Sequence, residues 1–229
     1  MKPLIGIVAR VEYPGGTHKL VINDEYRRRL ISKGADVTLI LPQGLIDYGD
    51  VPSREQEPLT QDEKDSIIRQ IKNCDGILMP GGFKTNNYDL FIMEYAIDND
   101  IPILGICLGM QILSFYKKEE IGNDKNETDI NHCLPEYTYV HQVTVDTKSK
   151  LYSIVKEDKF LVNSRHNYHA RPNDNFDVVA YAPDGIPEAI EMKNKKFVIG
   201  VQWHPENLHD EQSDRLFDSF LASCNTGRC

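Results

Sequence analysis

One cysteine of this 229-residue chain lies in a sequence setting that suits a nucleophile. Cys107 stands between Gly105 and Gly109, after an apolar run and before a segment of helical character. This is the thiol version of the nucleophile elbow, a sharp turn in which a Cβ on either glycine would crowd the backbone. At a helix N-terminus the dipole favours thiolate, and the N–H of Leu108 would face a developing oxyanion. We therefore predict a catalytic Cys107 with Leu108 as oxyanion donor; the alternative is a buried structural cysteine.

A histidine and a glutamate two residues apart supply the groups that a nucleophilic thiol needs. His204 and Glu206 follow another apolar run. In an extended chain, residues i and i+2 point the same way, so Glu206 would accept a hydrogen bond from the imidazole. Such a carboxylate orients the ring and favours the imidazolium, as the third member of a catalytic triad does. We expect His204 to move the proton and Glu206 to orient it; the alternative is a segment that merely ends a strand.

A pair of glycines provides a third element. Gly81 and Gly82 follow Pro80 at the end of a predicted strand over 74–79. The carboxyl ends of parallel strands meet at one edge of a sheet, so this turn would lie beside the elbow. We expect the N–H of Gly82 to complete the oxyanion hole with Leu108, although Pro-Gly-Gly is also a common plain turn.

The elements that position these residues alternate in the first half of the chain and are strand-rich in the second. Apolar runs and periodicity predict strands over 4–9, 36–41, 74–79 and 101–106, and helices over 21–33, 60–72, 88–99 and 108–117. The polar segment 117–136 is expected to be a surface connection. Strands follow over 139–145, 160–162, 178–181, 189–192 and 197–203, and a helix over 211–222. This order predicts an α/β fold in which helices flank a mixed, mostly parallel sheet, in a single domain over residues 1–229.

Composition excludes several classes of partner. The 26 Lys+Arg against 35 Asp+Glu give a net charge of −9, which argues against binding nucleic acid or an anionic membrane surface. No run approaches the ~20 apolar residues of a membrane span, and the N-terminal run suits a buried strand better than a signal peptide. The five cysteines form no CxxC pair, so we expect a cytoplasmic protein with neither a disulfide framework nor a metal site.

The motifs carry a family resemblance. G-I-C-L-G-M-Q around Cys107, the P-G-G turn and W-H-P-E around His204 resemble class I glutamine amidotransferase domains, in the family's order and over nearly the whole chain. Segments 24–35 and 163–166 look like the γ-glutamyl-amide hydrolase branch, typified by γ-glutamyl-γ-aminobutyrate hydrolase. The resemblance implies a flavodoxin-like core carrying a Cys–His–Glu amidohydrolase that needs no metal or organic cofactor.

The resemblance also implies a small-molecule γ-glutamyl substrate. Gln111, one helical turn after the nucleophile, would hold the glutamyl part, and Ser164 and His166 would line the pocket; ordinary loop or surface roles are the alternatives. Asn167 and Tyr168 stand where the branch has His and Gln, so the acyl group is better supported than any leaving amine. The remaining histidines show no partner spacing and receive no role: His18, His132, His141, His169 and His209.

Three hypotheses for the function remain at this stage. The first is a stand-alone hydrolase of a γ-glutamyl amine, in which water resolves a thioester. The second is a glutaminase subunit that passes ammonia to a separate synthetase, because the sequence has no G-x-x-x-x-G-K-[S/T] loop of its own. The third is a non-enzymatic binding member of the fold. A homodimer or a synthetase partner is open on sequence grounds.

Overall fold

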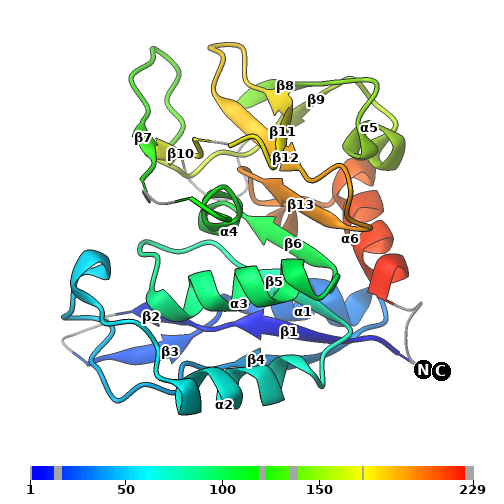
Figure 1. The fold of residues 1–229 in the computed structure, drawn as a ribbon. Coiled ribbons are helices and arrows are strands. Elements are labelled where there is room, and N and C mark those ends of the chain that lie inside the picture. Colours follow the sequence, from blue (N-terminus) through cyan, green and yellow to red (C-terminus); the bar gives the residue numbers. More distant parts are fainter. Residues whose placement is uncertain (1, 13–16, 119–121, 135–138, 172, 225–229) are drawn as a thin grey trace.

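A nine-stranded sheet runs through the computed structural model, which describes residues 2–12, 17–118, 122–134, 139–171 and 173–224 (Figure 1). The strand order is β4-β1-β5-β6-β13-β12-β11-β8-β9. The parallel part comprises β4 (Asp36–Ile40), β1 (Leu4–Val8), β5 (Gly76–Met79), β6 (Ile103–Ile106) and β13 (Val198–Val201). Antiparallel pairing then adds β12 (Pro187–Glu191), β11 (Asp177–Tyr181), β8 (His141–Val145) and β9 (Lys159–Val162). The predicted α/β class, with a mixed sheet and a β-rich C-terminal half, is confirmed.

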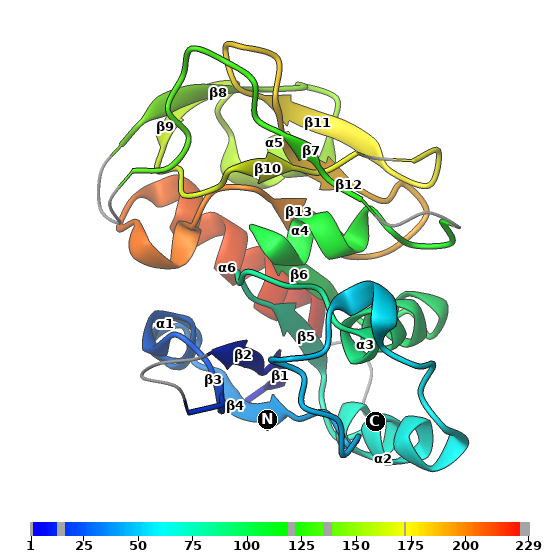
Figure 2. The ribbon, with the colours of Figure 1, turned by 90° about the vertical axis from the view of Figure 1, so that its left-hand side faces the viewer.

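Helices cover both faces of this sheet. The core cluster on one face includes α1 (Asp24–Ser32), α5 (Lys150–Val155) and α6 (Glu211–Cys224). The cluster on the other includes α2 (Gln61–Ile71), α3 (Asn87–Asp98) and α4 (Leu108–Leu113). Figure 2 shows α1 and α6 on the opposite side of the strands from α2 and α3. Strands β5, β6 and β13 are buried throughout, as expected where helices cover both faces. Within the described ranges, no helix is both long and apolar enough to cross a bilayer.

Several short elements depart from the sequence prediction. A hairpin of β2 (Arg10–Glu12) and β3 (Lys19–Val21) takes the start of the helix predicted over 21–33. That helix begins at Asp24 because Asn23 caps it, accepting the N–H of Glu25 at 3.1 Å. The described part of the predicted connection 117–136 contains β7 (Asp124–Lys125), which pairs with β10 (Tyr168–His169); residues 119–121 and 135–136 lie outside the described residues. Helix α5 and the 3₁₀ turns η2 (Ser53–Glu55) and η3 (Pro205–Asn207) were also not predicted.

The strand register places the candidate chemistry at one edge. Met79 pairs with Gly105 across β5 and β6, and Ile106 pairs with Val201 across β6 and β13. Because these strands run parallel, the Pro-Gly-Gly turn, the Cys107 elbow and the segment after β13 leave the sheet side by side. The shared edge that the sequence predicted is therefore present.

Candidate active site

The turn at Cys107 has the strained backbone of an elbow. Cys107 adopts φ 53°, and its N–H donates to the carbonyl of Val201 at 2.8 Å, which ties the turn to β13. A Cβ on Gly109 would lie 1.9 Å from the carbonyl oxygen of Met79, and one on Gly105 would lie 2.8 Å from the Gly109 backbone. The predicted steric reason for both glycines is confirmed, since neither position has room for a side chain.

The base lies beside this thiol. Nδ1 of His204 donates to Oε1 of Glu206 at 2.7 Å, and both side chains are buried. The pairing of the two side chains agrees with the prediction, but the backbone conformation between them does not. Pro205 begins a 3₁₀ turn where an extended segment was expected. Proline suits the first position of such a turn because that position needs no N–H donor. Asn163 fixes the backbone of His204, accepting its N–H at 2.8 Å and donating to its carbonyl at 2.9 Å.

Local charges set the protonation of the imidazole. Burial alone would lower the pKa of His204, but the Glu206 carboxylate and the Cys107 sulfur raise it to about 9. The imidazolium therefore predominates at neutral pH. Since Nδ1 faces Glu206, Nε2 is the nitrogen left for Cys107, which lines the same cavity wall and contributes to the raised pKa of His204. This arrangement can stabilise a thiolate and hold a proton ready for transfer.

A buried arginine and a tyrosine hold the Pro-Gly-Gly turn. Arg10 donates to the carbonyl of Pro80 through Nη2 at 2.8 Å and Nε at 3.2 Å, and forms an ion pair with the fully buried Asp89. The N–H of Gly81 donates to the hydroxyl of Tyr26 at 3.0 Å. Burial and the nearby Glu206 carboxylate raise the pKa of Tyr26, so the phenol keeps its proton.

The predicted oxyanion donors lie next to each other. A Cβ on Gly82 would come within 3.0 Å of the Leu108 side chain, so the Gly82 turn and the start of α4 are in contact. Tyr26 already occupies the Gly81 N–H, which leaves Gly82 as the next donor along the turn. The assignment of Gly82 and Leu108 to an oxyanion hole stays a prediction.

Cys107 opens into two cavities. Both are lined by a shared set of residues: Gly82, Phe83, Cys107, Cys133 and Arg165. The first, of about 380 Å³, lies on the His204 side and adds Arg10, Glu12 and Tyr26 to its walls. The second, of about 470 Å³, lies on the Gln111 side and adds Asn123, His166 and Tyr168. A substrate whose reacting carbon lies at Cys107 therefore has room on both sides of the bond.

Comparison with known proteins decides the family. The model of the family described as peptidase C26 matches residues 83–206, which contain the elbow, His204 and Glu206. The chain belongs to the peptidase C26 family. It is 29% identical to a glutamine amidotransferase-like protein of Rickettsia prowazekii, over 70% of this chain and 81% of that protein.

Other relatives of this C26 chain are much longer proteins. It is 30% identical to the CTP synthase of Chlamydia muridarum over 70% of its own length, but over only 36% of the CTP synthase. Among solved structures, it resembles the glutaminase domain of the Trypanosoma brucei CTP synthase with bound acivicin (TM-score 0.67, 19% identity, 100% and 96% of the chains). It also resembles a glutamine amidotransferase of Thermotoga maritima (TM-score 0.63, 13% identity, 99% and 100% of the chains). These likenesses show the fold.

Gln111 lines the second cavity of the C26 site and is buried, so the alternative of a solvent-facing side chain does not apply. Its Nε2 donates to the carbonyl of Tyr168 at 2.8 Å and to Oε1 of Gln202 at 3.3 Å, and its Oε1 accepts from Asn123 at 2.9 Å. With both N–H groups engaged, Gln111 can offer a ligand one remaining lone pair on Oε1.

The other two predicted substrate-binding residues take part in a separate cluster. The hydroxyl of Ser164 is fully buried and donates to the carbonyl of His132 at 3.0 Å. His166 lines the second cavity, and Nε2 of its ring faces Glu188 at 3.4 Å. Their roles toward a substrate stay predictions based on resemblance.

Arg165 also lies beside the His204–Glu206 pair, and sequence analysis gave it no role in the proton chemistry. Its Nη2 lies 2.8 Å from Nδ1 of His204, 3.2 Å from Oδ1 of Asn207 and 3.8 Å from Oε1 of Glu206. A guanidinium only donates, so the proton on Nδ1 must serve the closer carboxylate, and Arg165 places a positive charge beside Glu206. Arg165 lies in segment 163–166, which the resemblance singled out, but neither Arg165 nor Arg10 has a spacing relation to Cys107 that could have shown these contacts.

Proposed function

We propose that this chain is a cysteine-dependent amidohydrolase that cleaves the γ-glutamyl amide bond of a γ-glutamyl amine and releases glutamate and the amine. The observation that carries the proposal is the position of Cys107, within reach of the Glu206-bound His204 and between two cavities. The chemistry requires no metal or organic cofactor, because thiolate, imidazolium and backbone N–H groups supply every step.

The first half-reaction forms a thioester. The Cys107 thiolate attacks the γ-carbonyl carbon, and the N–H groups of Gly82 and Leu108 stabilise the oxyanion. When the C–N bond breaks, Nε2 of His204 transfers its proton to the leaving amine. The raised pKa of His204 keeps this proton available at neutral pH.

The second half-reaction returns the enzyme to its starting state. Neutral His204 takes a proton from water, and the resulting hydroxide attacks the thioester carbon. The C–S bond breaks and the new carboxyl group releases its proton to solvent, so glutamate leaves and the Cys107 thiolate again faces an imidazolium. Glu206 holds the ring in one orientation throughout.

The two cavities support a division between acyl group and amine. The glutamyl part would occupy the second cavity, where the free lone pair of Gln111 suits an α-ammonium group. The amine would occupy the first cavity, beside the proton donor His204. Its volume of about 380 Å³ is more than ammonia needs, which supports a substituted amine. Exposed Glu12 on its wall would attract a cationic substituent.

Similarity to CTP synthases favours a second candidate, a glutaminase that supplies ammonia to a separate synthetase. The chain covers 36% of the Chlamydia muridarum CTP synthase and 38% of the Lactobacillus helveticus enzyme, to which it is 29% identical. In this alternative glutamine is the substrate, and the synthetase is the partner. The same triad would form the same thioester.

Steady-state kinetics with no other protein present distinguish the two candidates. We expect kcat/KM for at least one γ-glutamyl amine to exceed that for glutamine. Glutamine as the best substrate, or activity only after addition of a synthetase, would establish the ammonia-donor function instead. Cys107→Ala provides the inactive control, and Cys133→Ala is its match, since the exposed Cys133 lines the same cavities.

A further inference from the structure

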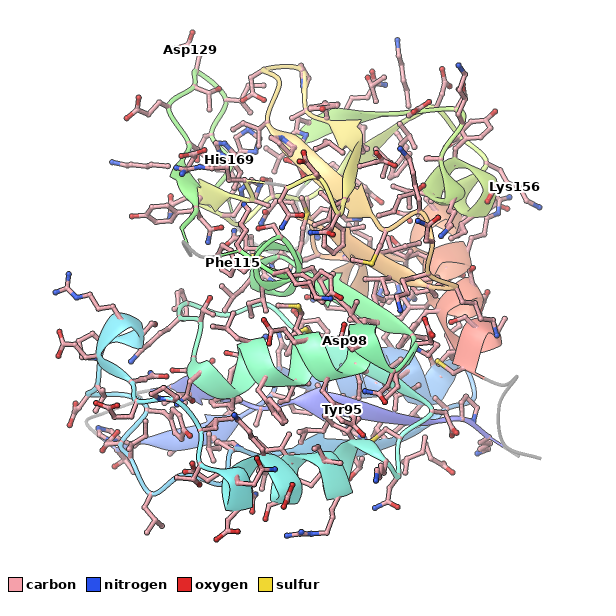
Figure 3. The ribbon with its side chains drawn as sticks, in the orientation of Figure 1. Tyr95, Asp98, Phe115, Asp129, Lys156 and His169 are labelled. Carbon is pink, nitrogen blue, oxygen red and sulfur yellow. The ribbon has the colours of Figure 1, made fainter. Side chains whose placement is uncertain are left out.

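A second group of histidines surrounds a buried carboxylate away from Cys107. Glu188, on β12, is fully buried. Nδ1 of His132 lies 3.5 Å from its Oε1, and Nε2 of His141 and Nε2 of His166 each lie 3.4 Å from the same atom. The three imidazoles have side-chain exposures of 1–3%. Strands β7 and β10 and the loops beside them lie close to this group. Figure 3 labels Asp129 and His169 in this region, and both lie far from Tyr95 and Asp98 of α3.

This cluster lacks the hydrogen bonds that a buried carboxylate needs. Among the residues that the structure describes, no donor makes a hydrogen bond to either oxygen of Glu188, and the ring nitrogens of His141 and His166 that face it are likewise unpartnered. Charge-assisted N–H···O bonds are usually about 2.7–2.9 Å long, well short of 3.4 Å. An ionised carboxylate left this way costs several kcal/mol, so the arrangement calls for a cation.

The outer nitrogen of each imidazole faces an oxygen acceptor. Nε2 of His132 lies 2.9 Å from Oδ2 of Asp184, Nδ1 of His166 lies 3.2 Å from the Tyr168 carbonyl, and Nδ1 of His141 lies 3.3 Å from the Gln142 carbonyl. A proton on each outer nitrogen satisfies these acceptors and leaves a lone pair directed toward Glu188. Carboxylates and carbonyls play this orienting part for histidines that bind metals.

Three further contacts surround these rings, and the first supports the assignment. Thr128 donates to Oδ2 of Asp184 at 2.5 Å and holds that carboxylate against His132. The Ser164 hydroxyl donates its one proton to the His132 carbonyl, so its oxygen, 3.1 Å from Nδ1 of His132, accepts from that nitrogen until a metal takes the place of the proton. The amide nitrogen of Asn126 donates to the His166 carbonyl at 3.0 Å and lies 3.2 Å from Nδ1 of His166, where it competes with the Tyr168 carbonyl for that nitrogen.

The spacing of the inner atoms matches a tetrahedral metal. Zinc binds imidazole nitrogen and carboxylate oxygen at roughly 2.0–2.1 Å, and a tetrahedron with such bonds separates its ligand atoms by roughly 3.3–3.4 Å. The observed separations from Oε1 of Glu188 are 3.4–3.5 Å, and the ligand atoms of His132, His166 and Glu188 all lie within 4.8 Å of one another. We propose that His132, His166 and Glu188 bind one divalent transition-metal ion of the zinc type, while His141 lies against the same Glu188 oxygen.

The charges of the cluster balance with such an ion. Three neutral imidazoles, ionised Glu188 and ionised Asp184 carry −2, which a divalent cation cancels inside the buried site. The metal joins β12 to the loops that carry His132 and His166. Because Asn163 holds His204 and the Tyr168 carbonyl holds Gln111, the same ion would stiffen the segment that flanks the active site.

Metal content and ligand type test the site directly. The full chain with Cys107→Ala and Cys133→Ala removes the thiols of the two cavities as competing ligands. After incubation with Zn²⁺ and desalting, mass spectrometry of the metal should give one zinc per chain. X-ray absorption should show nitrogen and oxygen neighbours at roughly 2.0–2.1 Å and no sulfur at roughly 2.3 Å. Less than about a tenth of an equivalent, or a shell containing sulfur, would overturn the proposal.

Substitutions locate the ion. Glu188→Gln and His132→Asn should each lower zinc occupancy at least tenfold. His169→Asn is the matched control and should keep the zinc, since Nδ1 of His169 faces Asn126 and Nε2 faces Asp124. Equal occupancy in His132→Asn and His169→Asn would overturn the assignment.

A measurement on the unsubstituted chain tests the metal site even when the substituted variants fail to fold. Chelation of the zinc-loaded protein should lower Tm by several degrees, and Zn²⁺ should restore it. Mg²⁺ should not, because it prefers oxygen ligands. An unchanged Tm on complete removal of the zinc, or equal recovery with Mg²⁺, would contradict a buried imidazole site.

Discussion

The molecule contains two places where histidine meets buried glutamate, and they differ in geometry. At the candidate active site, His204 and Glu206 are 2.7 Å apart, and a proton lies between them. At the second, His132, His141 and His166 surround Glu188 at 3.4–3.5 Å without a hydrogen bond. The first pair lies at the cavity that Cys107 also lines, whereas the side chains of the second group are buried, although His166 lines the second cavity.

The difference shows how the same residue types support different chemistry. A short bond from one imidazole to one carboxylate raises the basicity of the other ring nitrogen, which suits proton transfer to a neighbour. Several lone pairs that converge on one point without protons between them suit a cation. Removing a partner should therefore impair activity at the first site and mainly stability at the second.

The largest effect is expected at the nucleophile. Cys107→Ala should reduce amide hydrolysis on the order of 10⁴-fold or more, because no thioester can form. Tm should change little, since the thiol contributes little to the core. Kinetics and thermal unfolding test this, with Cys133→Ala retaining activity. Near-normal turnover in Cys107→Ala would exclude the covalent mechanism.

Substitutions of His204 and Glu206 should reduce kcat by different amounts. His204→Asn removes the group that moves the proton and should cost ~10²–10⁴-fold in kcat. Glu206→Gln removes only orientation and charge, so its loss should be smaller. If both substitutions matched Cys107→Ala, the carboxylate would need a direct part in the chemistry.

Substitution of Glu188 should mainly lower Tm, and substitution of Glu206 should mainly lower kcat. Glu188→Gln leaves the buried imidazoles without their shared anion and should lower Tm by several degrees, with a smaller loss of kcat than Glu206→Gln causes. Glu206→Gln should lower kcat with the smaller change in Tm. Differential scanning calorimetry and kinetics on the same preparations measure both quantities. Identical profiles would remove the distinction between the sites.

The smallest expected effect is a shift in the pH dependence of kcat/KM. The pKa of His204 is raised to about 9, so the imidazolium is present below that pH and lost above it. We therefore expect kcat/KM to fall as pH rises through about 9. Glu206→Gln removes the carboxylate that raises this pKa and should move the alkaline limb to lower pH. A pH–rate profile of each protein tests the shift, and an alkaline limb that stays in place would show that Glu206 does not control His204.

Local motifs made the first site predictable. Gly105, Cys107 and Gly109 lie within five residues, and their steric requirement follows from one tight turn. Alternating strands and helices predicted the parallel sheet, whose register brings the strand ends together. The pairing of His204 with Glu206 was predicted correctly from an incorrect extended backbone, because a 3₁₀ turn also brings the two side chains together.

Residues brought together by distant segments were beyond prediction. His132 and His141 had no informative spacing, His166 was singled out for a different role and only by resemblance, and Arg10 reaches Asp89 from 79 residues away. The hairpin of β2 and β3 was missed because three-residue strands give little periodic signal.

The α/β class, the elbow and the identity of the candidate nucleophile and base follow from sequence alone, because each depends on neighbours within a few residues. Which side chains share a buried space depends instead on the tertiary fold. Antiparallel pairing of β8, β11 and β12 brings His141 and Glu188 to one place, and the loops around β7 and β10 add His132 and His166. The pairing of strands far apart in the sequence sets the distances between these side chains. The periodicity within a single segment does not encode which strands pair.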